Sequence, residues 1–388
     1  MQFVTAGESH GSQLCAIVSG VPAGLVIDEA QINADLARRA SGFGRSSRQE
    51  IEHNTVSITS GLRFGKTLGS PVTLLVANAD GKNWSDRMST FGKAPKNLAR
   101  EVTPRPGHAD LVGALKNNTD DCRNVLERAS ARETAARVAA AGIAREFLAA
   151  LGVEVFSYVT RIGTAEFVEE APLESAPDYK PLDIEMSEVR CPNEEATEHM
   201  LKMIKVAQVK GESLGGCFRV VATGLVPGLG GFESGPERLT SQLGAALFSI
   251  PAIKGVEFGL GFEAAQRNGS EVHDLITHTK KSGYSRASNN AGGLEGGMTT
   301  GLPLIITAAM KPIPTMASPL KTVNMDTLEE AEASQERSDV CAVPSAAVVA
   351  EAEVCFVLAN AYLHKFGSDN MDDIQAALAA YKKRLLKG

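Results

Sequence analysis

Apolar and polar positions in the first part of the chain alternate as strands and one helix require. Residues 1–27 place short apolar segments between glycines and prolines, which is typical of strands and turns. Asp28 stands where a helix N-cap is expected, and apolar residues then recur at helical spacing as far as Arg39. Residues 54–77 return to the strand pattern. We therefore predict strands on both sides of a helix that begins near Asp28.

The rest of the chain mixes helices and strands in no regular order. An alanine-rich segment over 133–151 predicts a helix that ends at Gly152. Further helices are predicted over 194–209, 237–253, 326–335, 343–366 and 371–386. Further strands are predicted over 153–163, 216–226, 254–259 and 302–310. Because strands and helices do not alternate, we expect an α+β fold rather than a doubly wound α/β sheet.

Three stretches show little periodicity and are expected to be irregular. Residues 78–106 are polar, and residues 268–301 are rich in glycine and asparagine. Long loops in compact domains tend to be functional, so we expect both to contribute to a site. The acidic stretch 165–195 is expected to be solvated surface.

The overall composition is that of a soluble, folded protein. Of the 388 residues, 43% are hydrophobic and 22% are charged, which are ordinary values for globular chains. The net charge of −7 and the aromatic content of 5% disfavour binding to an extended nucleic acid. The six cysteines lie far apart, without the paired spacing of a zinc or redox site, so no metal site is predicted.

Nothing in the sequence predicts export or a membrane span. The first residues lack the basic and apolar segments of a secretory signal. The longest apolar stretch, 341–363, is interrupted by Glu351 and Glu353 and contains Pro344. We therefore expect a cytoplasmic protein without membrane contacts.

Two histidines stand beside glycines in short polar motifs. His10 lies in the sequence ESHG, and His108 lies in RPGHAD, two residues before Asp110. A single histidine in a turn is more often a structural hydrogen-bond partner than a reactive group. Two such motifs favour a pair of general acids, because histidine exchanges protons near neutral pH.

Arginines cluster around small residues in two places. Arg39, Arg45 and Arg48 lie around Gly42 and Gly44, and a second group that includes Arg132 lies around Ser130. Arginine is the bidentate donor for phosphate and carboxylate, so these four predict a site for an anionic small molecule. For Arg38 and Arg137 we prefer a solvated basic face.

Two further segments carry residues that could react. In Lys311–Thr315, which reads KPIPT, two prolines stiffen the chain and hold the lysine and threonine in place. Ser338 and Asp339 follow the helix predicted over 326–335. They could act in a site or could cap a helix, and the spacing leaves both readings open.

Two other functions can be argued from short motifs. GLGFEA at 259–264 is similar to the dinucleotide fingerprint of a nicotinamide oxidoreductase. We discount it, because Asn268 and Gly269 would cut the following helix short and no strand–helix–strand unit surrounds it. GFGRSSR at 42–48 could belong to a non-catalytic module that binds anions or RNA, whose binding would weaken steeply with salt.

Longer motifs extend from residue 5 to residue 351. They are TAGESHG (5–11), GFGR (42–45), FGKTLGSP (64–71), RPGHADL (105–111), DDCRNVLERASARETAARVAA (120–140), KPIPT (311–315), and ERSD with VPSAAVVAE (336–351). Together, and in this order, they closely resemble the chorismate synthase family.

The resemblance implies a carbon–oxygen lyase that acts on a phosphate ester. Such an enzyme converts 5-enolpyruvylshikimate 3-phosphate to chorismate by 1,4-elimination of phosphate and the C6 hydrogen, in the shikimate pathway to aromatic amino acids. It implies reduced FMN as cofactor without net redox change. NADPH serves members that reduce their own flavin, and a separate flavin reductase serves others. The implied fold is one domain over 1–388, a β-α-β sandwich with helices between antiparallel sheets, assembled as a homotetramer.

The resemblance also implies roles for individual residues. His10 would protonate the leaving phosphate, His108 would protonate or hydrogen-bond the reduced flavin at N1, and Asp339 would take the proton from N5. The FMN contacts carried over are Ser130, Ala131, Arg132, Pro251, Ala252, Gly296, Lys311, Pro312, Ile313, Pro314, Thr315 and Arg337. The substrate contacts carried over are Ser9, Arg39, Arg45, Arg48, Arg132 and Arg337. Whether Arg39 and Arg45 contact NADPH instead stays open.

Overall fold

The computed structural model describes residues 1–46, 52, 54–168, 181–280 and 283–386. Its first sheet is antiparallel and has the strand order β1-β2-β6-β3. Alternate residues of these strands, such as Leu14 and Leu74, are fully buried on the inner face. The strands are β1 Gln2–Ala6, β2 Gln13–Ser19, β3 Val56–Ser60 and β6 Val72–Ala77.

The second sheet is also antiparallel and has the order β10-β15-β9-β7-β8. Phe218, Val220 and Ala222 of its central strand face the core and are buried. The strands are β7 Glu154–Ile162, β8 Ala165–Glu166, β9 Gly216–Thr223, β10 Ile253–Phe258 and β15 Leu304–Met310.

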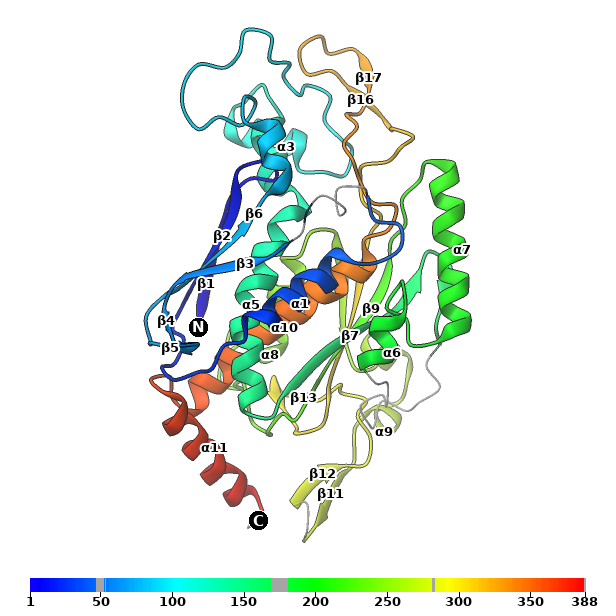
Figure 1. Cartoon of the computed structure of the whole chain (residues 1–388). Coiled ribbons are helices and arrows are strands. Elements are labelled where there is room, and N and C mark those ends of the chain that lie inside the picture. The colour runs from blue at the N-terminus through cyan, green and yellow to red at the C-terminus, as the bar shows by residue number, and fades with distance from the viewer. Residues whose placement is uncertain (47–51, 53, 169–180, 281–282, 387–388) are drawn as a thin grey trace.

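A layer of helices fills the space between the two sheets (Figure 1). The helices are α1 Glu29–Ala40, α5 Thr134–Ala150, α8 Leu239–Phe248 and α10 Val343–Phe366. Gly142 lets α5 approach α1, because a Cβ there would lie 2.6 Å from Ile32 Cγ1. The α+β class and the sandwich of helices between antiparallel sheets are therefore confirmed.

Helix α10 is buried on nearly all its faces. By length and composition it is the one helix in the described part of the chain that could cross a membrane, but 89% of its apolar window is buried inside the protein. An apolar surface all round is also what a central core helix requires. Packing between the sheets thus accounts for this composition.

The ends of several elements follow the local signals in the sequence. The Asp28 side chain accepts a hydrogen bond from the backbone N–H of Ala30, so the predicted N-cap of α1 is confirmed. Gly152 follows α5 with φ of 82°, the left-handed conformation that glycine tolerates best. The helix expected over 237–253 is shorter in the structure, where α8 covers Leu239–Phe248.

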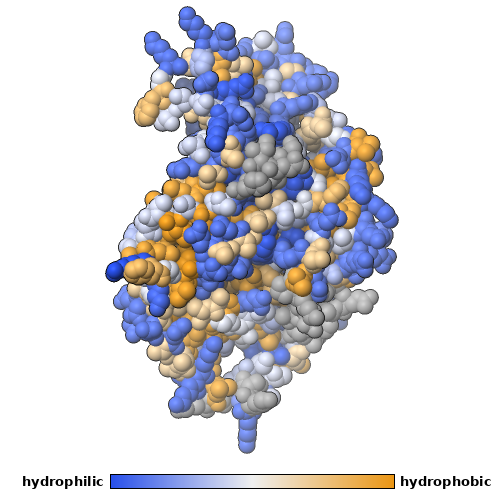
Figure 2. All heavy atoms as spheres, in the orientation of Figure 1, coloured by the Kyte–Doolittle hydropathy of each residue, from blue (hydrophilic) through white to orange (hydrophobic). Residues whose placement is uncertain are grey.

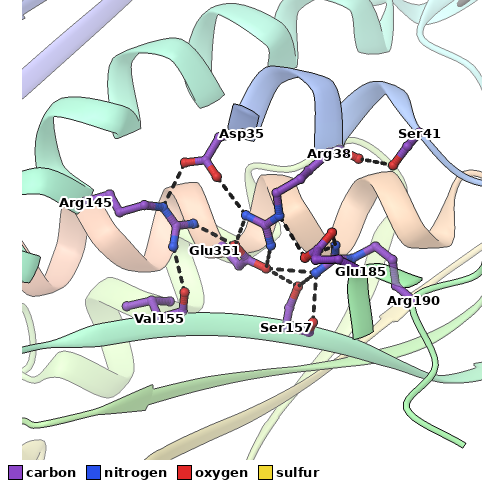
Figure 3. Close-up of polar contacts among 9 residues, drawn as sticks. All are labelled: Asp35, Arg38, Ser41, Arg145, Val155, Ser157, Glu185, Arg190 and Glu351. Atoms are coloured by element: carbon purple, nitrogen blue, oxygen red, sulfur yellow. Dashed lines mark hydrogen bonds and ion pairs between the residues drawn. The ribbon is translucent and has the colours of Figure 1, made fainter. Parts of the chain in front are cut away.

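Charged side chains form a buried network where α1, α5, α10 and β7 meet (Figure 3). Glu351 is fully buried and receives two hydrogen bonds from Arg38, at 2.8 and 2.9 Å, and one from Arg145 at 2.6 Å. Asp35 pairs with both of these arginines, and Arg190 reaches Glu351 at 3.3 Å. Burial opposes ionisation of Glu351, but the three arginines outweigh it and lower its pKa to about 2.

The expectation of a solvated basic face at Arg38 and Arg137 is wrong. Arg137 donates to Glu133 and Glu353, both largely buried, as Arg38 does to Glu351. Both arginines thus neutralise carboxylates of the helix layer instead of facing water.

The remaining elements surround this framework. The helices are η1 Ala79–Trp84, α3 Asp110–Asn117, α4 Arg123–Ala129, η2 Ala131–Glu133, α6 Pro181–Met186, α7 Glu194–Lys210, η3 Gly261–Gln266, α9 Gly269–Val272 and α11 Met371–Leu385. The short strands are β4 Leu62–Arg63, β5 Lys66–Thr67, β11 Ile276–Thr279, β12 Gly283–Arg286, β13 Leu294–Glu295, β14 Met298–Thr299, β16 Lys321–Val323 and β17 Glu330–Glu332. Figure 2 shows mainly hydrophilic side chains at the top of the view, where Figure 1 places the 78–106 loop and the β16–β17 hairpin.

The helix predicted over 326–335 is wrong, since this segment belongs to the β16–β17 hairpin. The Asn324 side chain accepts hydrogen bonds from the N–H groups of Asp326 and Thr327, and Leu328 has φ of 61°. This Asx-type turn competes with helix formation.

The segment GLGFEA also departs from a dinucleotide-binding turn. It forms the short 3₁₀ helix η3 after β10, a strand of an antiparallel sheet. A dinucleotide fingerprint requires a parallel strand–helix–strand unit, so the structure agrees with discounting it.

Candidate active site

A cavity of about 560 Å³ collects segments from the whole chain. It lies where the turn after β1, the end of α1, the α4–α5 junction, the end of β15 and the segment before α10 converge. Its lining includes Ser9, His10, Arg39, Arg45, Ser46, Glu52, Trp84, Arg105, Gly107, His108, Ala109, Leu126, Ala129, Ser130, Ala131, Arg132, Pro251, Ala252, Met310, Lys311, Ile313, Pro314, Thr315, Gln335, Glu336, Arg337, Ser338, Asp339 and Ala342. This volume is in the usual range for small-molecule sites.

His10 is held by Glu127 of α4. Its Nδ1 lies 2.9 Å from Glu127 Oε1, and its backbone N–H donates to Oε2 at 2.8 Å. Burial opposes ionisation of Glu127, but the hydrogen bonds and charge of His10 outweigh it and lower the pKa of this carboxyl. The carboxylate thus fixes the imidazole by its Nδ1 side.

His108 is held in a similar way by Asp110. Nδ1 of His108 lies 2.5 Å from Asp110 Oδ1, and Arg105 Nε donates to Oδ2 at 2.8 Å. Asp110 is fully buried, which opposes ionisation, but the hydrogen bonds from His108 and Arg105 hold its pKa well below the usual range. Arg105 also donates to Thr315 Oγ1 at 2.9 Å, which connects this group to the KPIPT segment.

The KPIPT segment lines one wall with most of its residues. Lys311 Nζ donates to the Gly107 carbonyl at 3.1 Å, and burial, with Lys254 nearby, lowers the pKa of its ammonium group. The hydroxyl of Ser213 donates to the Ile313 carbonyl at 2.6 Å. The prolines and these contacts fix a cation beside His108.

Asp339 lies opposite Arg45 on the segment before α10. It accepts hydrogen bonds from the backbone N–H of Ser46 at 2.8 Å and forms an ion pair with Arg45 at 3.0 Å. Ser338 donates to the Thr315 carbonyl at 3.0 Å. The alternative that these residues cap a helix is therefore wrong, because α10 begins at Val343 after an Ala342 N-cap.

Three of the predicted anion-binding arginines line the cavity. Arg39 is buried and donates to Thr134 Oγ1 at 2.9 Å, and Arg132 Nε donates to Asn78 Oδ1 at 2.8 Å. Arg45 Nε is buried with no hydrogen-bond partner among the described residues. A buried donor of this kind is suited to an anion that enters the cavity. Arg48 lies outside the described residues.

Most residues implied as FMN contacts also meet in this cavity. Ala252 stands out because its φ of 70° is rare for a residue other than glycine, and such strain tends to occur at functional sites. Arg337 pairs with the buried Asp80 at 2.5 Å. Pro312 is not among the lining residues, and Gly296 lies in the β13–β14 turn outside the lining. For all of these residues the FMN contact stays a prediction.

Sequence reasoning found one of the two carboxylates that hold the histidines. Asp110 stands two residues after His108 and was noted from that spacing, whereas Glu127 was missed. Glu127 and Trp84 are distant from His10 in sequence and carry no local signal. Among the described residues, no group of three or more histidine, cysteine or carboxylate side chains is arranged to hold a metal ion.

Two oriented imidazoles, several arginines and a lysine around one cavity are the kinds of groups that an enzyme uses for acid–base chemistry on an anionic small molecule. A model of the chorismate synthase family matches residues 1–363. This chain belongs to the chorismate synthase family, whose members are lyases of aromatic amino acid biosynthesis.

Named relatives cover nearly the whole chain. It is 50% identical to chorismate synthase of Bacillus velezensis, over 99% of both chains, and 49% identical to that of Bacillus subtilis, over the same shares. It is 48% identical to chorismate synthase of Aquifex aeolicus, over 98% of this chain and 97% of the relative. A solved structure titled "Crystal Structure of Chorismate Synthase" aligns with a TM-score of 0.81 and 39% identity, over 100% of this chain and 98% of the other.

Proposed function

We propose that this chain converts 5-enolpyruvylshikimate 3-phosphate to chorismate and phosphate, with reduced FMN bound beside the substrate. Family membership supports the reaction, and the cavity supports its location. The observation that carries the location is that two carboxylate-held histidines and five arginines from distant segments line one cavity. A phosphate and two carboxylates are the groups that such arginines bind best.

The residues present also fit a reduced flavin. Arg45 offers a buried N–H without a hydrogen-bond partner among the described residues, and Ala252, whose φ is 70°, lines the cavity. Ser130–Arg132, Lys311, Ile313–Thr315 and Arg337 would hold the cofactor, and Pro312 and Gly296 are also proposed contacts. When bound, reduced FMN supplies a transient electron to the substrate and accepts the C6 hydrogen, and it returns unchanged.

The chain's own groups would manage the protons of this reaction. His10, with Nδ1 engaged by Glu127, would protonate the departing phosphate from Nε2. His108 would donate at flavin N1, and Asp339 would accept the proton at N5. Ser9, Arg39, Arg45, Arg48, Arg132 and Arg337 would orient the substrate, unless Arg39 and Arg45 bind NADPH.

Together with this reaction we propose the assembly and location of the enzyme and the source of its reduced FMN. The chain would act as one domain over 1–388, in a cytoplasmic homotetramer, without nucleic acid or membrane partners. Reduced FMN would come from NADPH at this site or from a separate reductase. Size-exclusion chromatography with light scattering measures the assembly, and a monomer as the only species would contradict it.

Phosphate release under anaerobic conditions tests the function. The protein is mixed with the enolpyruvyl substrate and FMN reduced by dithionite, and parallel samples receive oxidised FMN with or without NADPH. Release only with reduced FMN is expected, and release with NADPH and oxidised FMN would show intrinsic flavin reduction. No release with reduced FMN, or equal release without flavin, would contradict the proposal.

A variant separates the role of His10 from general damage. His10→Ala should lower turnover roughly 10²- to 10⁴-fold with FMN affinity nearly unchanged, as expected for loss of a general acid. His199→Ala, at an exposed histidine of α7, is the matched control and should keep full activity. Full activity in His10→Ala would reject its role.

A further inference from the structure

Trp84 is the only tryptophan in the sequence, and it lies in the cavity wall at the end of η1. Its indole stacks on the imidazole of His10, with ring centroids 4.0 Å apart and an angle of 27° between the planes. Parallel stacking at this distance constrains the tilt of both rings. No step of the proposed function uses Trp84.

The segment that carries Trp84 is fastened to the turn that carries His10. Asn78, at the start of η1, donates from its side chain to the carbonyls of Glu8 at 3.1 Å and Gly11 at 2.9 Å. Gly81 packs on the same turn so closely that a Cβ there would lie 2.5 Å from the Gly11 carbonyl. The two rings are therefore placed relative to each other by a short, well-bonded path.

Glu127 holds the edge of the His10 imidazole, and Trp84 covers its face. Glu127 binds Nδ1 and the backbone N–H of His10, and Arg123 donates to Glu127 Oε1 at 3.2 Å. The Arg123 guanidinium also lies over the indole, 5.1 Å from its centroid, as does that of Arg87 at 5.3 Å. The carboxylate thus fixes rotation in the ring plane, and the indole fixes the plane itself.

We propose that Trp84 is a positioning residue that sets the ring plane of His10, so that Nε2 points toward the leaving phosphate. This inference rests on the proposed function, in which His10 is the general acid. Trp84 acts through His10 and has no chemical role of its own. An alternative, that the indole is a platform for the flavin, becomes an outcome of the test.

Substitutions at Trp84 separate these roles. Trp84→Leu should lower kcat roughly 2- to 10-fold, the factor that corresponds to loss of one aromatic stack, with KM and FMN affinity little changed. Trp84→Phe keeps a stacking ring and should restore most of kcat. A large loss of FMN affinity with kcat unchanged would overturn the proposal in favour of a flavin platform.

Trp84 fluorescence tests the stack without relying on activity. Because Trp84 is the only tryptophan in the sequence and its indole stacks on the His10 imidazole, its emission reports on this contact. The emission of the folded protein should change in His10→Asn. It should stay unchanged in His108→Asn.

The two readouts distinguish failure of this inference from failure of the proposed function. A Trp84 emission that changes in His10→Asn, in a protein without phosphate release, would support the stack and reject the proposed function. The positioning role would be overturned by an active enzyme whose Trp84 emission is the same in the wild type and in His10→Asn. It would also be overturned by an unchanged kcat in Trp84→Leu.

Discussion

Glu351→Gln tests whether buried charges stabilise the helix layer as the network in Figure 3 implies. The substitution keeps the size of the side chain and removes the charge that faces Arg38, Arg145 and Arg190. These arginines would then remain in the interior without their shared carboxylate. Breaking a buried pair from one side generally costs roughly 3–5 kcal/mol.

The structure gives a magnitude for this loss. The pKa of Glu351 falls from its ordinary 4.5 to about 2 in the folded protein. At about 1.4 kcal/mol per pH unit, folding favours the charged form by about 3 kcal/mol. Because the folded-state pKa is the lower one, this stabilisation is fully present above about pH 4.5. It is lost as the pH falls toward 2.

Urea denaturation followed by circular dichroism measures the effect. At pH 7 we expect Glu351→Gln to lower the free energy of unfolding by about 3 kcal/mol, and the gap to the wild type should shrink to roughly half near pH 3. Glu353→Gln is the matched control two residues along the same helix. Burial raises the pKa of Glu353 despite Arg137, so a neutral side chain there should cost less than about 1 kcal/mol. Two results would refute the reasoning. One is an equal loss of unfolding free energy in Glu351→Gln and Glu353→Gln, and the other is a difference between Glu351→Gln and the wild type that does not change with pH.

Two further predictions concern packing and the arginines. Gly142→Ala should destabilise the protein by roughly 1–3 kcal/mol, because the new Cβ would clash with Ile32, whereas Gly244→Ala meets open space and should be neutral or stabilising in thermal unfolding. Arg39→Gln should raise KM for the enolpyruvyl substrate roughly tenfold or more, as loss of a charged hydrogen bond implies, and leave the rate of NADPH-driven flavin reduction unchanged. The reverse pattern would assign Arg39 to NADPH.

Local signals predicted the framework because they act over a few residues. The Asp28 cap and the apolar period of α5 are properties of single segments, and both appear where expected. The helix expected over 326–335 is absent because the Asn324 side chain accepts hydrogen bonds from the following backbone N–H groups and forms a turn. The spacing of apolar residues carries no information about such a turn. Helices α3 and α4 were not predicted, although their residues belong to motifs used for the family resemblance.

The sequence pointed to several residues that line the cavity but not to all of the groups that hold them. His10 and His108 stand in short motifs, but the carboxylate that holds His10 comes from a residue 117 positions away. The neighbouring residues Arg38 and Arg39 show the same limit of reasoning from local sequence. Arg38 faces the buried network and Arg39 the cavity, and this choice depends on how α1 is rotated against α5 and α10. No pattern in the local sequence fixes that rotation.

A structure determined with both reduced FMN and the enolpyruvyl substrate bound tests the central claim most directly. We expect both molecules in the cavity lined by His10 and His108, with the substrate phosphate within hydrogen-bond distance of His10 and the flavin ring between His108 and Asp339. Density for either molecule elsewhere, or a phosphate remote from His10, would contradict this account.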